Sequence, residues 1–221
     1  MNRSISIKNA FKLTVVVVAW FGLILQFYLF MKGSPQRTYW EKVINYFSYF
    51  TILTNMTIAV GTSASLFFPK SAIGNFCSNA VTESGFTVYI LIVGIIYHFF
   101  LRNLWDPQGS QWLSDWILHK ATPILYFFYW AIFVDKGYLK WVNSVQWLVF
   151  PLVYFVYSLI RGASTGFYAY PFIEVNKIGY PKTLVNAAWI LAAFLATGIV
   201  IIIADKIFVS RARRREPEST K

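Results

Sequence analysis

Long runs of mainly apolar residues alternate with short polar connections along most of the chain. Six of these runs lie at residues 13–31, 47–68, 86–104, 113–134, 146–160 and 183–204. An α-helix needs roughly 20 apolar residues to cross about 30 Å of hydrocarbon, and it satisfies its own backbone amides within lipid. The pattern therefore predicts an all-α integral membrane bundle of six transmembrane helices, the fifth of them short and tilted or kinked at Pro151.

Composition agrees with a membrane protein. Of the 221 residues, 57% are hydrophobic, 20% are aromatic and only 13% are charged, and the mean hydropathy is +0.52. A soluble domain of this size has a lower hydrophobic share and a higher charged share. No segment has the composition of a separate soluble domain, so we expect one transmembrane domain over residues 1–205 and a basic cytoplasmic tail over 206–221.

The formal net charge of +11 is a feature that nucleic-acid-binding proteins share. Most of the Lys and Arg residues, however, lie in connections and tails beside the apolar runs, where they meet anionic lipid head groups and set topology. With six crossings both termini share one side, and that side has the excess of basic residues, chiefly through Arg211 and residues 213–215. We therefore expect both termini in the cytoplasm, membrane lipids as partners and no nucleic acid.

The polar residues within the runs gather toward the membrane face opposite the termini. The outer halves contain Gln26, Thr51, Thr54, Asn55, His98, Arg102, Asp115, His119, Thr122, Ser158, Arg161 and Asn186. The inner halves hold mainly small or neutral polar residues such as Thr62, Ser65 and Thr87, which suit helix packing. Because ionisable groups in lipid are costly, this separation predicts an outward-facing polar cavity.

Helical spacing places several of these residues on common faces, since residues three or four apart are neighbours. Thr51 and Asn55 share one face, Asp115 and His119 another, and His98 lies one turn before Arg102. Each residue also has a purely structural interpretation: a threonine bonds to a carbonyl one turn back, a histidine bridges two helices, and an aspartate favours a helix start. Only their convergence indicates a site.

Three segments carry a resemblance to a known family. They are residues 49–53 (Tyr-Phe-Thr-Ile-Leu) at the start of the second run, residues 112–123 with His119 and Pro123, and residues 170–174 (Tyr-Pro-Phe-Ile-Glu) in the last outer connection. The chain resembles, over nearly its whole length, the androgen-induced-gene-1-like family of six-span membrane proteins, and closely its bacterial branch, the Pr6Pr proteins. Pro123 lies one residue nearer to the histidine than in the animal members.

The resemblance implies an activity and a location. Characterised animal members are threonine hydrolases that cleave fatty acid esters of hydroxy fatty acids, and the roles of their threonine and histidine fall on Thr51 and His119 here. It implies an intramembrane threonine hydrolase that cleaves such esters or similar lipid esters, in the bacterial cytoplasmic membrane.

Ester hydrolysis needs a nucleophile, a base and donors for the oxyanion. We expect His119 to take the proton of Thr51 and Asp115 to orient His119, with Asp106 as the second choice. The remaining candidates are assigned to substrate binding. They are Asn55 and Asn186 as oxyanion donors, Arg102 and Arg161 for a substrate carboxylate, Tyr170 and Glu174 for the loop over the cavity, and His98.

No cofactor or metal is expected, because the chain has one cysteine, two histidines and no clustered carboxylates. Two other functions stay open. The first is a non-catalytic membrane transporter or lipid-binding protein with an outward-facing polar cavity, although a transport pathway needs polar lining in the inner halves too. The second is a structural subunit whose polar cluster serves only helix packing.

Overall fold

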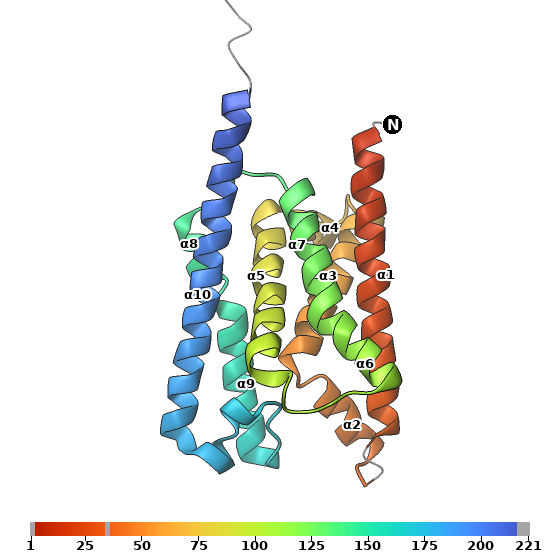
Figure 1. Cartoon of the computed structure of the whole chain (residues 1–221), viewed down its shortest axis with the longest axis vertical. Coiled ribbons are helices and arrows are strands. Elements are labelled where there is room, and N and C mark those ends of the chain that lie inside the picture. The colour runs from red at the N-terminus through yellow and green to blue at the C-terminus, as the bar shows by residue number, and fades with distance from the viewer. Residues whose placement is uncertain (1–2, 34–35, 216–221) are drawn as a thin grey trace, which may run out of the picture.

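A computed structural model describes residues 3–33 and 36–215, and this part of the chain is a bundle of helices without strands (Figure 1). The helices are α1 (Arg3–Lys32), α2 (Tyr39–Tyr46), α3 (Phe50–Phe67), α4 (Ala72–Cys77), α5 (Ala80–Ile96), α6 (Gly109–Trp116), α7 (Thr122–Phe133), α8 (Trp141–Gln146), α9 (Val149–Thr165) and α10 (Val175–Arg215). Two π-helical turns, η1 (Tyr97–Leu101) and η2 (Ile117–Ala121), follow α5 and join α6 to α7, and a 3₁₀ turn, η3 (Pro171–Ile173), precedes α10. The predicted all-α class is confirmed.

Five helical segments of the described chain are long and apolar enough to cross a membrane: Ser6–Lys32, Phe50–Phe67, Ala80–Leu101, Trp141–Thr165 and Val175–Ser210. Large apolar side chains cover their outer surface, among them Ile24, Ile160 and Trp189, which are 63%, 66% and 73% exposed. A soluble protein would bury such a surface, so the chain is an integral membrane protein.

The predicted fourth crossing is not among these five segments. The backbone is helical from Gly109 to Phe133 and packs against α1 and α5, but this stretch contains Asp115, His119 and Lys120. These polar residues reduce its hydropathy. Length and composition therefore do not confirm the count of six, although this stretch runs along the bundle with the other long helices (Figure 1).

The start of α1 and the end of α10 lie at the same end of the bundle, which we call the terminal end (Figure 1). The opposite end, here the site end, contains α2, α6, η1 and η3. α10 continues through Asp205 to Arg215, so the helix extends into the segment predicted as a basic cytoplasmic tail. The division at residue 205 stays a prediction. Residues 216–221 of the predicted tail lie outside the described part. Gly179, with φ 73°, bends the chain inside α10 just before Pro181.

The terminal half of the bundle is more polar inside than predicted. Lys12 and Glu83 are only 5% and 3% exposed, although both lie outside the apolar runs defined from the sequence. Lys12 Nζ donates to Ser65 Oγ at 2.9 Å, and the Tyr129 hydroxyl donates to Glu83 Oε1 at 2.7 Å. Apolar inner halves were predicted because Lys12 and Glu83 lie outside the apolar runs. α1 and α5 extend past those runs, however, and bury the two residues against neighbouring helices.

A buried carboxylate also joins α10 to the end of α7. Asp205 is 1% exposed, and its two oxygens lie 2.9 and 3.0 Å from the backbone nitrogen of Gly137, which donates to them. Gly137 has φ 96°, a conformation that favours glycine and turns the chain after α7. This contact holds the connection between α7 and α8 against α10.

We expect Asp205→Ala to destabilise the bundle, because it leaves the Gly137 N–H without its acceptor. A hydrogen bond to a charged group contributes about 1.5–3 kcal/mol to stability. The thermal unfolding midpoint in detergent micelles should fall measurably below that of Asp135→Ala, which removes an exposed carboxylate from the same connection. Equal midpoints for the two variants would show that the Asp205 contact does not stabilise the fold.

Candidate active site

Thr51 lies in the first turn of α3, where backbone N–H groups have no partner within the helix. Tyr49 is the N-cap residue of α3, and its side chain does not cap the helix. Instead the backbone N–H of Thr51 donates to the hydroxyl of Tyr170 at 3.2 Å. The Thr51 side chain is buried, so its hydroxyl lies within the protein at the site end of the bundle.

The two residues with predicted catalytic roles meet. Thr51 Oγ1 lies 3.4 Å from Nε2 of His119, which comes from η2. The other ring nitrogen, Nδ1, lies 3.0 Å from the backbone oxygen of Asp115 and 3.2 Å from Asp115 Oδ1. Both partners of Nδ1 are acceptors, so the proton of a neutral imidazole belongs on Nδ1 and the lone pair of Nε2 faces Thr51.

An unpredicted tyrosine completes this group. The ring of Tyr97 stacks on the imidazole of His119, with ring centroids 3.9 Å apart and planes 18° apart. The Tyr97 hydroxyl donates to Asp115 Oδ2. The sequence carried no clear signal for this role, because Tyr97 is one of many aromatic residues. Its neighbour His98 was predicted as the site residue of this helix instead, on the face that it shares with Arg102.

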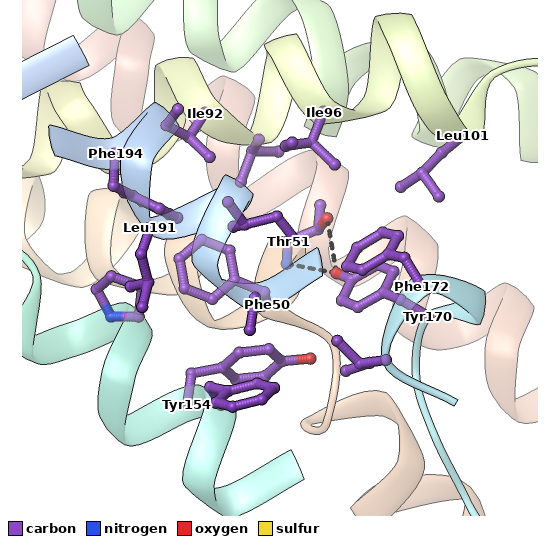
Figure 2. A pocket seen from close by; sticks show the side chains of 16 residues that line it. Phe50, Thr51, Ile92, Ile96, Leu101, Tyr154, Tyr170, Phe172, Leu191 and Phe194 are labelled. Atoms are coloured by element: carbon purple, nitrogen blue, oxygen red, sulfur yellow. Dashed lines mark hydrogen bonds between the residues drawn. The ribbon is translucent and has the colours of Figure 1, made fainter. Parts of the chain in front are cut away.

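Tyr170 lies beside Thr51, with its hydroxyl directed at the threonine, as Figure 2 shows. Its hydroxyl is 3.3 Å from Thr51 Oγ1, and its ring stacks on Phe172 at a centroid distance of 5.1 Å. Burial raises the pKa of Tyr170 to about 12, so the phenol is neutral at physiological pH and has a proton to donate. The loop before α10 therefore supplies a hydrogen-bond donor to the site.

Two cavities border Thr51. One is apolar and narrow, about 70 Å³, and lies between α3, α5, α9, α10 and η3, with Phe50, Ile92, Leu191 and Phe194 on its walls (Figure 2). The other is larger, about 490 Å³, and its lining includes the polar side chains of Asp115 and His119. Thr51, Leu101 and Tyr170 line both cavities. The threonine is thus part of the wall between the apolar cavity and the larger one, which we call the polar cavity because its lining carries charged and polar side chains.

The two predicted oxyanion donors are occupied with backbone carbonyls. Asn55 Nδ2 donates to the oxygens of Thr51 at 2.8 Å and Leu118 at 3.2 Å, which ties α3 to η2. Asn186 Nδ2 donates to the oxygen of Phe172 at 2.8 Å, which holds η3 against α10. Both amides therefore position the elements of the site, and neither lines the two cavities.

The predicted charged residues do not converge on Thr51. His98 and Arg102 are exposed and lie within 3.4 Å of each other, outside both cavities. Arg161 donates to Asn45 Oδ1 at 2.5 Å and also lines neither cavity. Glu174 pairs with Lys177 at 3.0 Å, not with an arginine.

The second choice to orient His119, Asp106, is exposed, whereas Asp115 is buried beside the imidazole. The basic residues on the wall of the polar cavity are instead Arg37 and Lys42, which sequence reasoning missed because they lie before the second apolar run. Within residues 3–33 and 36–215, no group of three or more His, Cys, Asp and Glu side chains is arranged to hold a metal ion.

The arrangement can support proton transfer between a hydroxyl and an imidazole at the boundary of two cavities. Comparisons of the chain with models of known protein families, with curated proteins and with solved structures give no match.

Proposed function

We propose that this chain is an intramembrane threonine hydrolase that cleaves lipid esters, with Thr51 as nucleophile, His119 as base and Asp115 as the residue that orients the base. The observation that carries the proposal is the position of Thr51 Oγ1. It lies 3.4 Å from His119 Nε2, on the wall shared by an apolar and a polar cavity. A small movement brings this pair to the 2.6–3.2 Å at which a proton can pass.

The reaction proceeds in two steps that return the protein to its starting state. His119 Nε2 takes the proton of Thr51 as Oγ1 attacks the ester carbonyl, and the imidazolium then gives that proton to the leaving alcohol. The acyl group is now bound to Thr51. His119 next takes a proton from water, the hydroxide attacks the acyl ester, and the proton passes to Thr51 Oγ1 as the fatty acid leaves.

The oxyanion that forms in each step needs donors that are already in place. Tyr170 is the best candidate, because its neutral hydroxyl lies 3.3 Å from Thr51 Oγ1 and borders both cavities. The partly unpaired backbone N–H groups at the start of α3 add a favourable dipole. These groups replace Asn55 and Asn186, whose amides are occupied.

The two cavities suggest how a lipid ester is held. The apolar cavity lies among α5, α9 and α10, and we assign the acyl chain to it. The polar cavity receives water and the alcohol part of the ester. The resemblance to the androgen-induced-gene-1-like family supports fatty acid esters of hydroxy fatty acids, or similar esters, as substrates.

The orientation that we propose places both termini in the cytoplasm of a bacterium and the site at the outer face. The excess of basic residues in the terminal connections supports it. The start of α1 and the end of α10 both lie at the terminal end of the bundle, which agrees with an even number of crossings (Figure 1).

A transporter or lipid-binding protein is the second candidate. Its support is stronger than the sequence indicated, because the terminal half of the bundle contains buried polar groups. Lys12 and Glu83 are buried there, which provides polar groups along the inner half of a pathway. Flux of a lipid ester or its head group into liposomes, without formation of a free fatty acid, would support this candidate over the hydrolase.

We expect Thr51→Ala and His119→Ala to reduce hydrolysis of a long-chain ester in detergent micelles about a thousand-fold or more, because each removes an atom of the proton-transfer pair. Thr51→Ser should retain measurable activity, since it keeps the hydroxyl. A fluorophosphonate probe should label the wild-type protein and leave Thr51→Ala unlabelled.

Thr57→Ala is the matched control, because Thr57 is on the same helix and its hydroxyl bonds only to the Leu53 carbonyl, at 2.9 Å. It should retain full turnover. Wild-type turnover in a folded Thr51→Ala protein would exclude Thr51 as the nucleophile.

We expect Leu191→Trp to fill part of the apolar cavity and to discriminate against long acyl chains. Each methylene that loses its buried position costs about 0.8 kcal/mol, so displacement of two or three should lower kcat/KM for a palmitoyl ester about ten-fold or more. An acetyl ester should be affected much less. Val200→Trp changes a residue of α10 that is 61% exposed, away from the cavity, and should leave both substrates unaffected. Equal losses for both esters would place the acyl chain elsewhere.

A further inference from the structure

We infer that Tyr97 is a positioning residue that fixes the tautomer and the ring plane of His119. The inference rests on the proposed function for its catalytic consequence, but its structural content can be measured without an activity assay. Tyr97 lines the polar cavity, to which we assign the alcohol part of the ester, and its contacts with the proposed catalytic residues are those with Asp115 and His119. Its positioning role acts through these two residues.

The hydroxyl of Tyr97 acts on the carboxylate of Asp115. This carboxylate is 7% exposed, so its oxygens depend on protein donors. Oδ2 accepts a hydrogen bond from Tyr97, and Oδ1 lies 3.2 Å from His119 Nδ1. A carboxylate held at one oxygen cannot rotate freely, so the Tyr97 hydroxyl keeps the other oxygen directed at Nδ1.

The ring of Tyr97 acts on the imidazole itself. Its stacking on His119, at 3.9 Å and 18°, restricts rotation of the imidazole about its bond to Cβ. A neutral imidazole has two tautomers, and the one with the proton on Nδ1 is required for Nε2 to accept from Thr51. The hydroxyl and the ring of Tyr97 thus favour the same active arrangement by separate contacts.

The backbone places Tyr97 in this position. Tyr97 begins η1, where the N–H of Arg102 donates to the Tyr97 oxygen at 2.9 Å across five residues. His119 lies within η2, in which the N–H of Thr122 donates to the oxygen of Ile117 across the same interval. The helices also come close at Gly94, where an added Cβ would lie 3.3 Å from the His119 oxygen. Single π-helical turns within α-helices occur frequently at functional sites.

The chain has only two histidines, which makes a direct test practical. Protein labelled with ¹⁵N-histidine should show, in NMR spectra in micelles, His119 as a single tautomer protonated at Nδ1. His98→Gln removes the other imidazole and assigns the signals. Tyr97→Phe leaves the Asp115 backbone oxygen, 3.0 Å from Nδ1, as the remaining fixed acceptor, so it should convert part of His119 to the tautomer protonated at Nε2. The upfield shift of the ring protons should remain, since the stacked ring remains. Tyr97→Leu should lose both features.

Kinetics supply the second readout. Tyr97→Phe should lower kcat about ten-fold with KM little changed, and Tyr97→Leu should lower it further. Tyr126→Phe is the matched control, because it removes a buried tyrosine hydroxyl from α7 that lies outside both cavities, and it should change neither the tautomer nor kcat.

A single Nδ1-protonated tautomer in Tyr97→Phe would overturn the inference, whatever the kinetics show. A tautomer that changes in Tyr97→Phe, in a protein whose wild type hydrolyses no ester, would support the positioning role and reject the proposed function.

Discussion

Polar groups inside an apolar bundle must find their partners within the protein, and the start of α3 shows this constraint most clearly. The first backbone N–H groups of a helix have no acceptor of their own, and the Tyr49 side chain does not supply one. The hydroxyl of Tyr170, more than a hundred residues away along the chain, accepts from the Thr51 N–H. That contact draws the loop before α10 over α3 and places the Thr51 hydroxyl between a phenol and an imidazole.

The same constraint shapes the surroundings of His119. Asp115 accepts from Tyr97 and lies within reach of His119 Nδ1, and the rings of Tyr97 and His119 stack on each other. The carbonyl of Leu118 accepts from Asn55. The terminal half of the bundle contains comparable groups, with Lys12 bonded to Ser65 and Glu83 to Tyr129. None of these four residues lines the cavities that Thr51 borders. Burial of an ionisable residue therefore does not by itself identify a site in this bundle, and the adjoining cavities distinguish Thr51 and His119.

Several residues were predicted to act together because they lie at similar depth, and depth alone did not decide which ones meet. His98 and Arg102 share the site end with Thr51, but their helix face turns outward, so both are exposed. Asn55 and Asn186 are buried, yet each donates to a carbonyl that would otherwise lack a partner. A residue can share the depth of a site and still serve the backbone around it.

The order of apolar and polar residues was sufficient to predict a helical membrane protein, its approximate helix positions and the pairing of Asp115 with His119, because these depend on local composition and on helical spacing. Thr51 and His119 were also predicted to act together, and Tyr170 to belong to the loop over their cavity, with help from the family resemblance. The tertiary structure alone brought Tyr97 onto His119 and divided the space around Thr51 into two cavities. The reason is physical: a π-helical turn, the rotation of each helix about its axis and the distance between helices depend on how all the side chains pack together, and no local pattern along the chain determines that packing.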